Sequence, residues 1–84
     1  TLDLNSVAVI KGKYRLPVIV DPSHGTGLRE IVPAMSVAAI ATGADGLMIE
    51  SHVNPDNSIS DARETISIDT MGKIIERVKA NNLF

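Results

Sequence analysis

Two short apolar runs, each closed by a carboxylate, restrict the folds open to this chain. The first is VIVD at residues 18–21, and the second is GLMIE at residues 46–50. Continuous apolar runs of this length are typical of strands covered on both faces, as in parallel sheets flanked by helices. The sequence therefore predicts two buried strands of an α/β fold.

Helical patterns surround both runs. NSVAVIKGKY precedes the first run, GLREIVPAMSVAAIATG separates the two, and SIDTMGKIIERVKANN follows the second. Asn5 and Ser67 stand where N-caps are expected, and Gly43 is a suitable residue just beyond a helix C-terminus. HVNPDNSISDARETI reads as a polar loop. An α-β-α-β-α order predicts parallel neighbouring strands joined by a crossover helix.

The chain length sets a second limit. Two strands cannot make a stable α/β sheet alone, so the 84 residues are expected to belong to a larger α/β protein. Where that larger sheet is complete, we predict that Val18, Val20, Met48 and Ile49 are buried.

Charge and composition exclude several classes of partner. The net charge is −2, which gives no electrostatic reason to bind nucleic acid or an anionic membrane, and we expect neither partner. There is no apolar run of the roughly 20 residues that a membrane span needs. The absence of cysteine is compatible with a cytoplasmic protein, which is the expected location.

The residues that carry chemistry follow the two predicted strands. His24 comes just after the first run, Glu50 closes the second, and Asp61 lies in the loop beyond it. Because ligands bind at the carboxyl ends of strands in parallel α/β folds, these three side chains are expected on one rim. One imidazole and two carboxylates suit Mn²⁺, Fe²⁺, Co²⁺ or Zn²⁺ better than Ca²⁺. His52 is expected to support the ligands from beside them or to lie in the loop, rather than to be a ligand.

Spacing alone leaves a simpler interpretation open for each residue. His24 can be a loop histidine bonded to backbone, and Glu50 can end its strand in a salt bridge with Arg15 or Arg29. Asp61 can be an ordinary turn or cap residue.

A family resemblance favours the metal site. DPSHGTGLREIVPAMSVAAIATGADGLMIESHVNPDNSISDA resembles the C-terminal barrel segment of 3-deoxy-D-arabino-heptulosonate-7-phosphate (DAHP) synthase, in the subfamily related to 3-deoxy-octulosonate-8-phosphate synthase. The resemblance implies an α/β fold in which residues 1–84 form part of one (β/α)₈ TIM barrel. The segment would comprise the end of the sixth helix and the last two strand–helix units.

The resemblance also implies an activity. This family condenses phosphoenolpyruvate with erythrose 4-phosphate in the first step of the shikimate pathway, and we expect a homo-oligomer. Its divalent metal is held by Cys, His, Glu and Asp, of which His24, Glu50 and Asp61 match three as catalytic metal ligands. The cysteine has no counterpart here, and Glu64 stands where many relatives carry Gln.

Three other interpretations remain at this point. One is the sister octulosonate synthase, another is a non-catalytic barrel fragment, and the third is an unrelated α/β binding module in which His24 is structural. The isolated segment is expected to be inactive, because most of the substrate-binding Arg and Lys residues of the family lie upstream.

Overall fold

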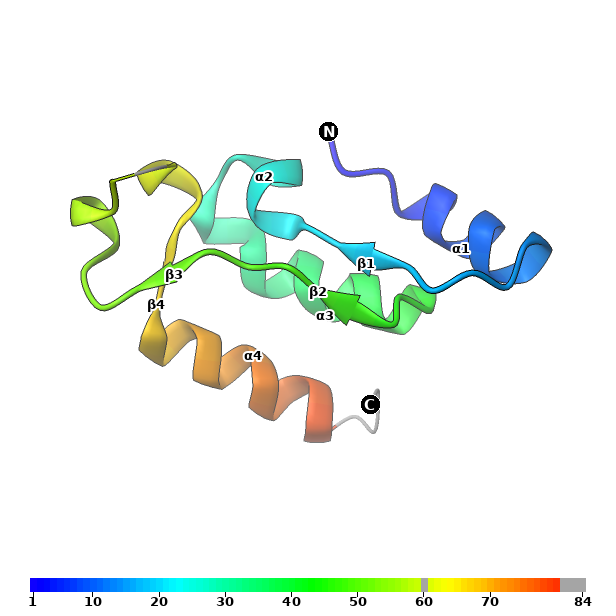
Figure 1. Cartoon of the computed structure of the whole chain (residues 1–84). Helices are drawn as coiled ribbons and strands as arrows, with labels where there is room; N and C mark the ends of the chain where they lie inside the picture. Colours follow the sequence, from blue (N-terminus) through cyan, green and yellow to red (C-terminus); the bar gives the residue numbers. More distant parts are fainter. Residues whose placement is uncertain (60, 81–84) are drawn as a thin grey trace.

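The computed structural model describes residues 1–59 and 61–80. Its helices are α1 (Leu4–Lys13), α2 (Pro22–Thr26), α3 (Val32–Thr42) and α4 (Ile68–Ala80) (Figure 1). Its strands are β1 (Ile19–Val20), β2 (Gly46–Leu47), β3 (Ser51–His52) and β4 (Ile66–Ser67). Three short 3₁₀ turns lie between them: η1 (Arg29–Ile31), η2 (Pro55–Asn57) and η3 (Ala62–Glu64).

The two predicted strands are parallel neighbours. Ile19 pairs with Gly46 and Val20 pairs with Leu47, and α3 makes the connection between the strands. A hydrogen bond from Met48 N to the Val20 carbonyl, at 2.8 Å, continues the pairing toward the carboxyl ends. The predicted parallel arrangement is therefore confirmed, although the regular strands are shorter than the apolar runs.

The hydrophobic core lies between the strands and the helices. α3 packs against both α1 and α4, and Figure 1 shows α3 running behind β1 and β2. The buried apolar residues come from α1, β1, α3, β4 and α4, with Ala44 just after α3: Val7, Val20, Val32, Ala39, Ile40, Ala44, Ile66, Ile74 and Val78. One face of the small sheet is thus covered by helices.

Some apolar side chains on the strands are left uncovered. Ile19 is 58% exposed and Met48 is 59% exposed, whereas Val18 and Ile49 are partly buried and Val20 is buried. Alternation along a strand sends successive side chains to opposite faces. Ile19 and Met48 therefore need covering elements that this segment does not provide, and the burial of Met48 remains a prediction for a complete barrel.

The first helix begins two residues earlier than the sequence suggests. Asp3, not Asn5, is the N-cap: its carboxylate accepts hydrogen bonds from the backbone N–H of Ser6 at 3.3 Å and from the Ser6 hydroxyl at 2.7 Å. A carboxylate at this spacing satisfies a free helix N–H as well as an amide does, so Asn5 lies inside the helix.

Two other helix ends match their predictions. The Ser67 hydroxyl accepts a hydrogen bond from Thr70 N at 3.0 Å, as an N-cap does. Gly43 ends α3 with φ at 116°, a left-handed conformation that strains other residues.

The segment predicted as a polar loop contains structure that the sequence did not indicate. β3 and β4 pair in parallel, with Ser51 opposite Ile66 and His52 opposite Ser67. The pairing brings β4 back beside Glu50, whose carbonyl accepts a hydrogen bond from Ile66 N at 3.0 Å. This pairing returns Asp61 toward the end of the second apolar run.

Among the helices of the described ranges, none is both long enough and apolar enough to cross a membrane.

Candidate metal centre

His24 is oriented by the residue that caps its own short helix. One oxygen of Asp21 accepts a hydrogen bond from His24 N at 2.9 Å, and the other lies 2.7 Å from His24 Nδ1. Pro22 opens α2, and Gly27 ends it in a left-handed conformation with φ at 69°. Because the Asp21 carboxylate accepts a hydrogen bond from Nδ1–H, the ring is oriented with the other nitrogen, Nε2, facing away from Asp21.

Glu50 is held by its backbone and by a neighbouring hydroxyl. Its N–H donates to the hydroxyl of Ser23, a fully buried residue, at 3.0 Å. The Thr65 hydroxyl lies 3.3 Å from Glu50 Oε2, leaving Oε1 at 2.9 Å from His24 Nε2. The carboxylate therefore faces the imidazole with Oε1, while Oε2 lies near the Thr65 hydroxyl.

Asp61 reaches the same imidazole from the returning loop. Its Oδ2 lies 2.8 Å from His24 Nε2, and its backbone is left-handed, with φ at 48°. Asp tolerates that conformation better than most residues. Two hydrogen bonds to its carbonyl, from Glu64 N and from the Thr65 hydroxyl, both at 2.9 Å, fix the turn.

The structure thus brings the three predicted site residues together. One ligand atom from each of His24, Glu50 and Asp61 lies within 4.8 Å of the other two. Glu50 faces His24 rather than Arg29, which instead donates to the Ala62 carbonyl and lies 2.9 Å from Asp56. His52 ends the short strand β3 and is not part of this group of three.

His52 serves its own turn. Its Nδ1 accepts a hydrogen bond from Asn54 N at 2.9 Å. The neighbouring histidine of this segment is therefore a local turn residue, and it offers a matched control for His24.

Four residues of the site were missed by sequence reasoning. Asp21 stands three residues before His24, the usual N-cap spacing, and that spacing could have identified it. Ser23, Glu64 and Thr65 gave no such signal, because their contacts depend on how the loop returns to the strand end.

The cluster carries more negative than positive charge. The side-chain hydrogen bond to Asp61, then the one to Asp21, raise the pKa of His24 to about 9, with a further electrostatic contribution from Glu50, despite partial desolvation. An imidazolium ion is thus the only positive group among the carboxylates of Asp21, Glu50 and Asp61. A divalent cation at the same place would satisfy those oxygens and leave the imidazole neutral.

The shifted pKa of His24 predicts a pH dependence for the metal-free protein. Since the pKa is raised in the folded state, from 6.5 to about 9, the stabilisation is fully present below pH 6.5 and is lost as the pH rises through about 9. The affinity for a divalent metal should rise over the same pH range, because metal binding displaces the proton from the His24 imidazole. Thermal melts and metal titrations of the complete protein between pH 6 and 9.5 test both trends, and pH-independent affinity would contradict the shift.

The donor set fits a transition metal. An imidazole nitrogen and two carboxylate oxygens suit Mn²⁺, Fe²⁺, Co²⁺ or Zn²⁺. A further observation agrees: Glu64 Oε2 is buried without a hydrogen-bond partner and lies 3.7 Å from His24 Nε2. A buried carboxylate oxygen is costly unless a donor or cation satisfies it, so the site has capacity for additional positive charge.

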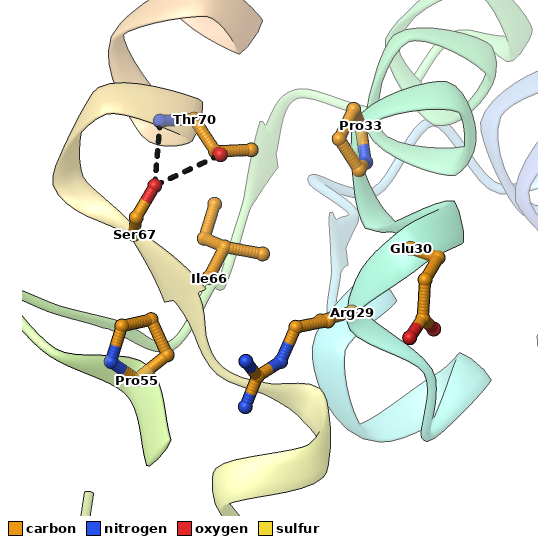
Figure 2. Close-up of a pocket in the computed structure, with 7 residues that line it drawn as sticks. All are labelled: Arg29, Glu30, Pro33, Pro55, Ile66, Ser67 and Thr70. Carbon is orange, nitrogen blue, oxygen red and sulfur yellow. Dashed lines mark hydrogen bonds between the residues drawn. The ribbon is translucent and has the colours of Figure 1, made fainter. Parts of the chain in front are cut away.

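A separate pocket lies on the helix side of the loop (Figure 2). Its lining residues are Arg29, Glu30, Pro33, Pro55, Ile66, Ser67 and Thr70, and none of the three predicted metal ligands is among them. Figure 2 shows the Ser67 hydroxyl joined to Thr70 at the start of α4. The pocket does not coincide with the metal cluster, and Arg29 there is already paired with Asp56.

Two parallel strand–helix units, with a histidine and carboxylates gathered at the ends of their strands, define a segment of an α/β barrel with a candidate metal site. The sequence profile of the DAHP synthetase I family matches residues 1–82. The chain belongs to that family, which confirms the resemblance.

Individual relatives agree with the family assignment. The chain is 37% identical over 79 residues to the phospho-2-dehydro-3-deoxyheptonate aldolase of Thermotoga maritima, covering 94% of this chain and 23% of the relative. It is 33% identical over 89 aligned positions to a 2-dehydro-3-deoxyphosphooctonate aldolase of Legionella pneumophila, covering 93% of this chain and 32% of the relative. The chain therefore spans about a quarter to a third of these relatives.

A solved structure shows the same fold. A truncated form of 3-deoxy-D-arabino-heptulosonate 7-phosphate synthase from Thermotoga maritima superposes with a TM-score of 0.91 at 36% identity. The match covers 95% of this chain and 30% of that structure. The predicted fold class, a C-terminal part of a TIM barrel, is confirmed.

Proposed function

We propose that this chain is the C-terminal barrel segment of a metal-dependent transferase that condenses phosphoenolpyruvate with erythrose 4-phosphate to form DAHP. The observation that carries the proposal is the convergence of His24 Nε2, Glu50 Oε1 and Asp61 Oδ2 from two strand ends and a returning loop. Family membership supplies the reaction. The complete barrel is this segment together with the strand–helix units that precede it in the relatives.

His24, Glu50 and Asp61 would hold the divalent metal. When bound, the metal would act as a Lewis acid toward the aldehyde of the sugar phosphate. Ligation requires a neutral imidazole, and Asp21 on Nδ1 retains the tautomer that leaves Nε2 available.

The other residues of the site fix the ligands in place. Ser23 anchors the backbone of Glu50, and Thr65 touches both the Glu50 carboxylate and the Asp61 carbonyl. Ser23 and Thr65 are almost wholly buried, so their hydroxyls are held by packing. Preorganised ligands preserve the orientation on which catalysis depends.

Removal of the metal tests the proposed reaction. The purified complete barrel should consume phosphoenolpyruvate when Mn²⁺ and erythrose 4-phosphate are supplied, and should lose that activity when a chelator removes the metal. Activity that persists fully after metal removal would contradict the proposed role of the cluster.

The second candidate is the sister octulosonate reaction, favoured by the similarity to the Legionella relative. An eight-carbon product requires a five-carbon sugar phosphate as the partner of three-carbon phosphoenolpyruvate. A parallel assay with an aldopentose phosphate separates the two reactions, since the proposed function requires a clear preference for the four-carbon aldehyde.

A further inference from the structure

Glu64 is the fourth carboxylate around His24, and it has a different environment from the others. Its Oε2 is buried, has no hydrogen-bond partner, and lies 3.7 Å from His24 Nε2. Its side chain is 20% exposed, less than that of Asp21, Glu50 or Asp61. Oε2 therefore reaches His24 at ion-pair distance without receiving a hydrogen bond from the described residues.

The position of Glu64 is set by the same turn that places Asp61. Glu64 N donates to the Asp61 carbonyl at 2.9 Å, which ties the two residues across η3. The other carboxylate oxygen, Oε1, lies toward the left-handed turn at Gly27, where an added Cβ would lie 3.8 Å from it. The carboxylate is thus held between the imidazole and this turn.

The distances separate Glu64 from the three ligands. Glu50 Oε1 and Asp61 Oδ2 lie 2.9 and 2.8 Å from Nε2, nearly one ångström closer than Glu64 Oε2. The set whose atoms are mutually within 4.8 Å contains His24, Glu50 and Asp61 without Glu64. Glu64 therefore lies close enough to influence a bound cation electrostatically, but too far out to belong to the set of three ligands.

We propose that Glu64 is an outer-sphere positioning residue of the metal centre. Its Oε2 accepts a hydrogen bond from a non-protein ligand of the cation, such as water, and its negative charge strengthens cation binding. This inference rests on the proposed function, because it requires that the cluster binds a divalent metal. It accounts for a buried oxygen that receives no hydrogen bond from the described residues and lies beside the three ligands.

Mn²⁺ titration of the complete barrel by calorimetry tests the inference. Glu64→Gln keeps the shape and removes the charge, and should weaken Mn²⁺ binding by about tenfold, the lower end of the 10–100-fold range for outer-sphere partners. Glu64→Ala should weaken it by close to 100-fold on the same scale. The control Glu76→Gln removes an equivalent charge from an exposed position on α4 and should change binding by less than about twofold.

Melting temperatures distinguish this role from simple packing. Without metal, Glu64→Gln should melt close to the parent, since it gives up only a 3.7 Å ion pair to His24 and removes a buried carboxylate oxygen that receives no hydrogen bond. The rise in melting temperature on adding Mn²⁺ should be smaller in the variant, as linkage requires. A variant that melts lower without metal while retaining the parent affinity for Mn²⁺ would show that Glu64 is only structural.

The two hypotheses fail in different ways. If the parent binds Mn²⁺ and His24→Ala does not, while Glu64→Gln and Glu64→Ala bind normally, the role of Glu64 is overturned and the metal site stands. If the parent itself does not bind Mn²⁺, or His24→Ala binds as the parent does, the proposed metal site is wrong and the role of Glu64 falls with it.

Discussion

Replacing His24 with alanine in the complete barrel should abolish metal-dependent condensation while the protein remains folded. His24 supplies the only nitrogen of the cluster, and its Nε2 is the atom on which Glu50 and Asp61 converge. Its side chain is 45% exposed, so truncation removes little packing. We expect turnover to fall by at least about 1,000-fold, since a Lewis acid supplies several kcal/mol of transition-state stabilisation.

The matched control for this variant is His52→Ala. That histidine contacts the backbone of its own loop, at Asn54 N, and should tolerate truncation with activity near that of the parent. Metal content after dialysis, turnover and circular dichroism are measured for both variants. Near-normal activity in His24→Ala would remove His24 from the site, whatever the behaviour of the control.

The other two ligands should form a graded series with His24. Glu50→Ala removes an oxygen facing the imidazole and should resemble His24→Ala in metal content. Asp61→Asn retains an oxygen that can still face the cation, so its loss should be milder. Glu50 is anchored through Ser23, and its truncation leaves that backbone bond intact, so the protein should fold.

The sequence was sufficient to predict the parallel strands and to expect His24, Glu50 and Asp61 at one edge of the sheet. Apolar runs and intervening helical periodicity are local properties, and the carboxyl ends of parallel strands share one edge. From those two facts, His24 and Glu50 were expected to meet, and the structure brings them within 2.9 Å. Asp61 was expected on the same rim, but its assignment as a ligand needed the resemblance, because nothing in its own surroundings indicates where a long loop will return.

The parts that the sequence did not predict depend on contacts between distant residues. The pairing of β3 with β4 involves two residues on each side, too few to leave a periodic pattern. Glu64 carries no local signal either, since its burial follows from the η3 turn and from Gly27. The sequence alone could not choose between Asp3 and Asn5 as the N-cap, because both residue types cap helices well. The hydrogen bond from Ser6 N to Asp3 identifies Asp3.

Residues 1–84 expressed alone should neither bind Mn²⁺ tightly nor consume phosphoenolpyruvate. The chain spans 23% of its Thermotoga relative, and a (β/α)₈ barrel needs about 250 residues to close. The strands that carry the ligands pair over only two residues each, and their outer edges lack the neighbouring strands that a closed barrel supplies. The contacts that fix the ligands, such as the Glu50 N–H to Ser23 bond, therefore depend on a sheet that the isolated segment cannot complete.

The isolated segment should also self-associate, because its sheet exposes apolar surface and unpaired edges. Ile19 and Met48 are 58% and 59% exposed, and exposed strand edges recruit other chains. Met48→Lys should therefore shift the segment toward monomer in sedimentation experiments. Ile59→Lys is the control, since Ile59 is fully exposed on the loop and away from the sheet, and it should have a smaller effect. A monomeric parent segment that binds one Mn²⁺ tightly and turns over substrate would show that these 84 residues suffice as an enzyme.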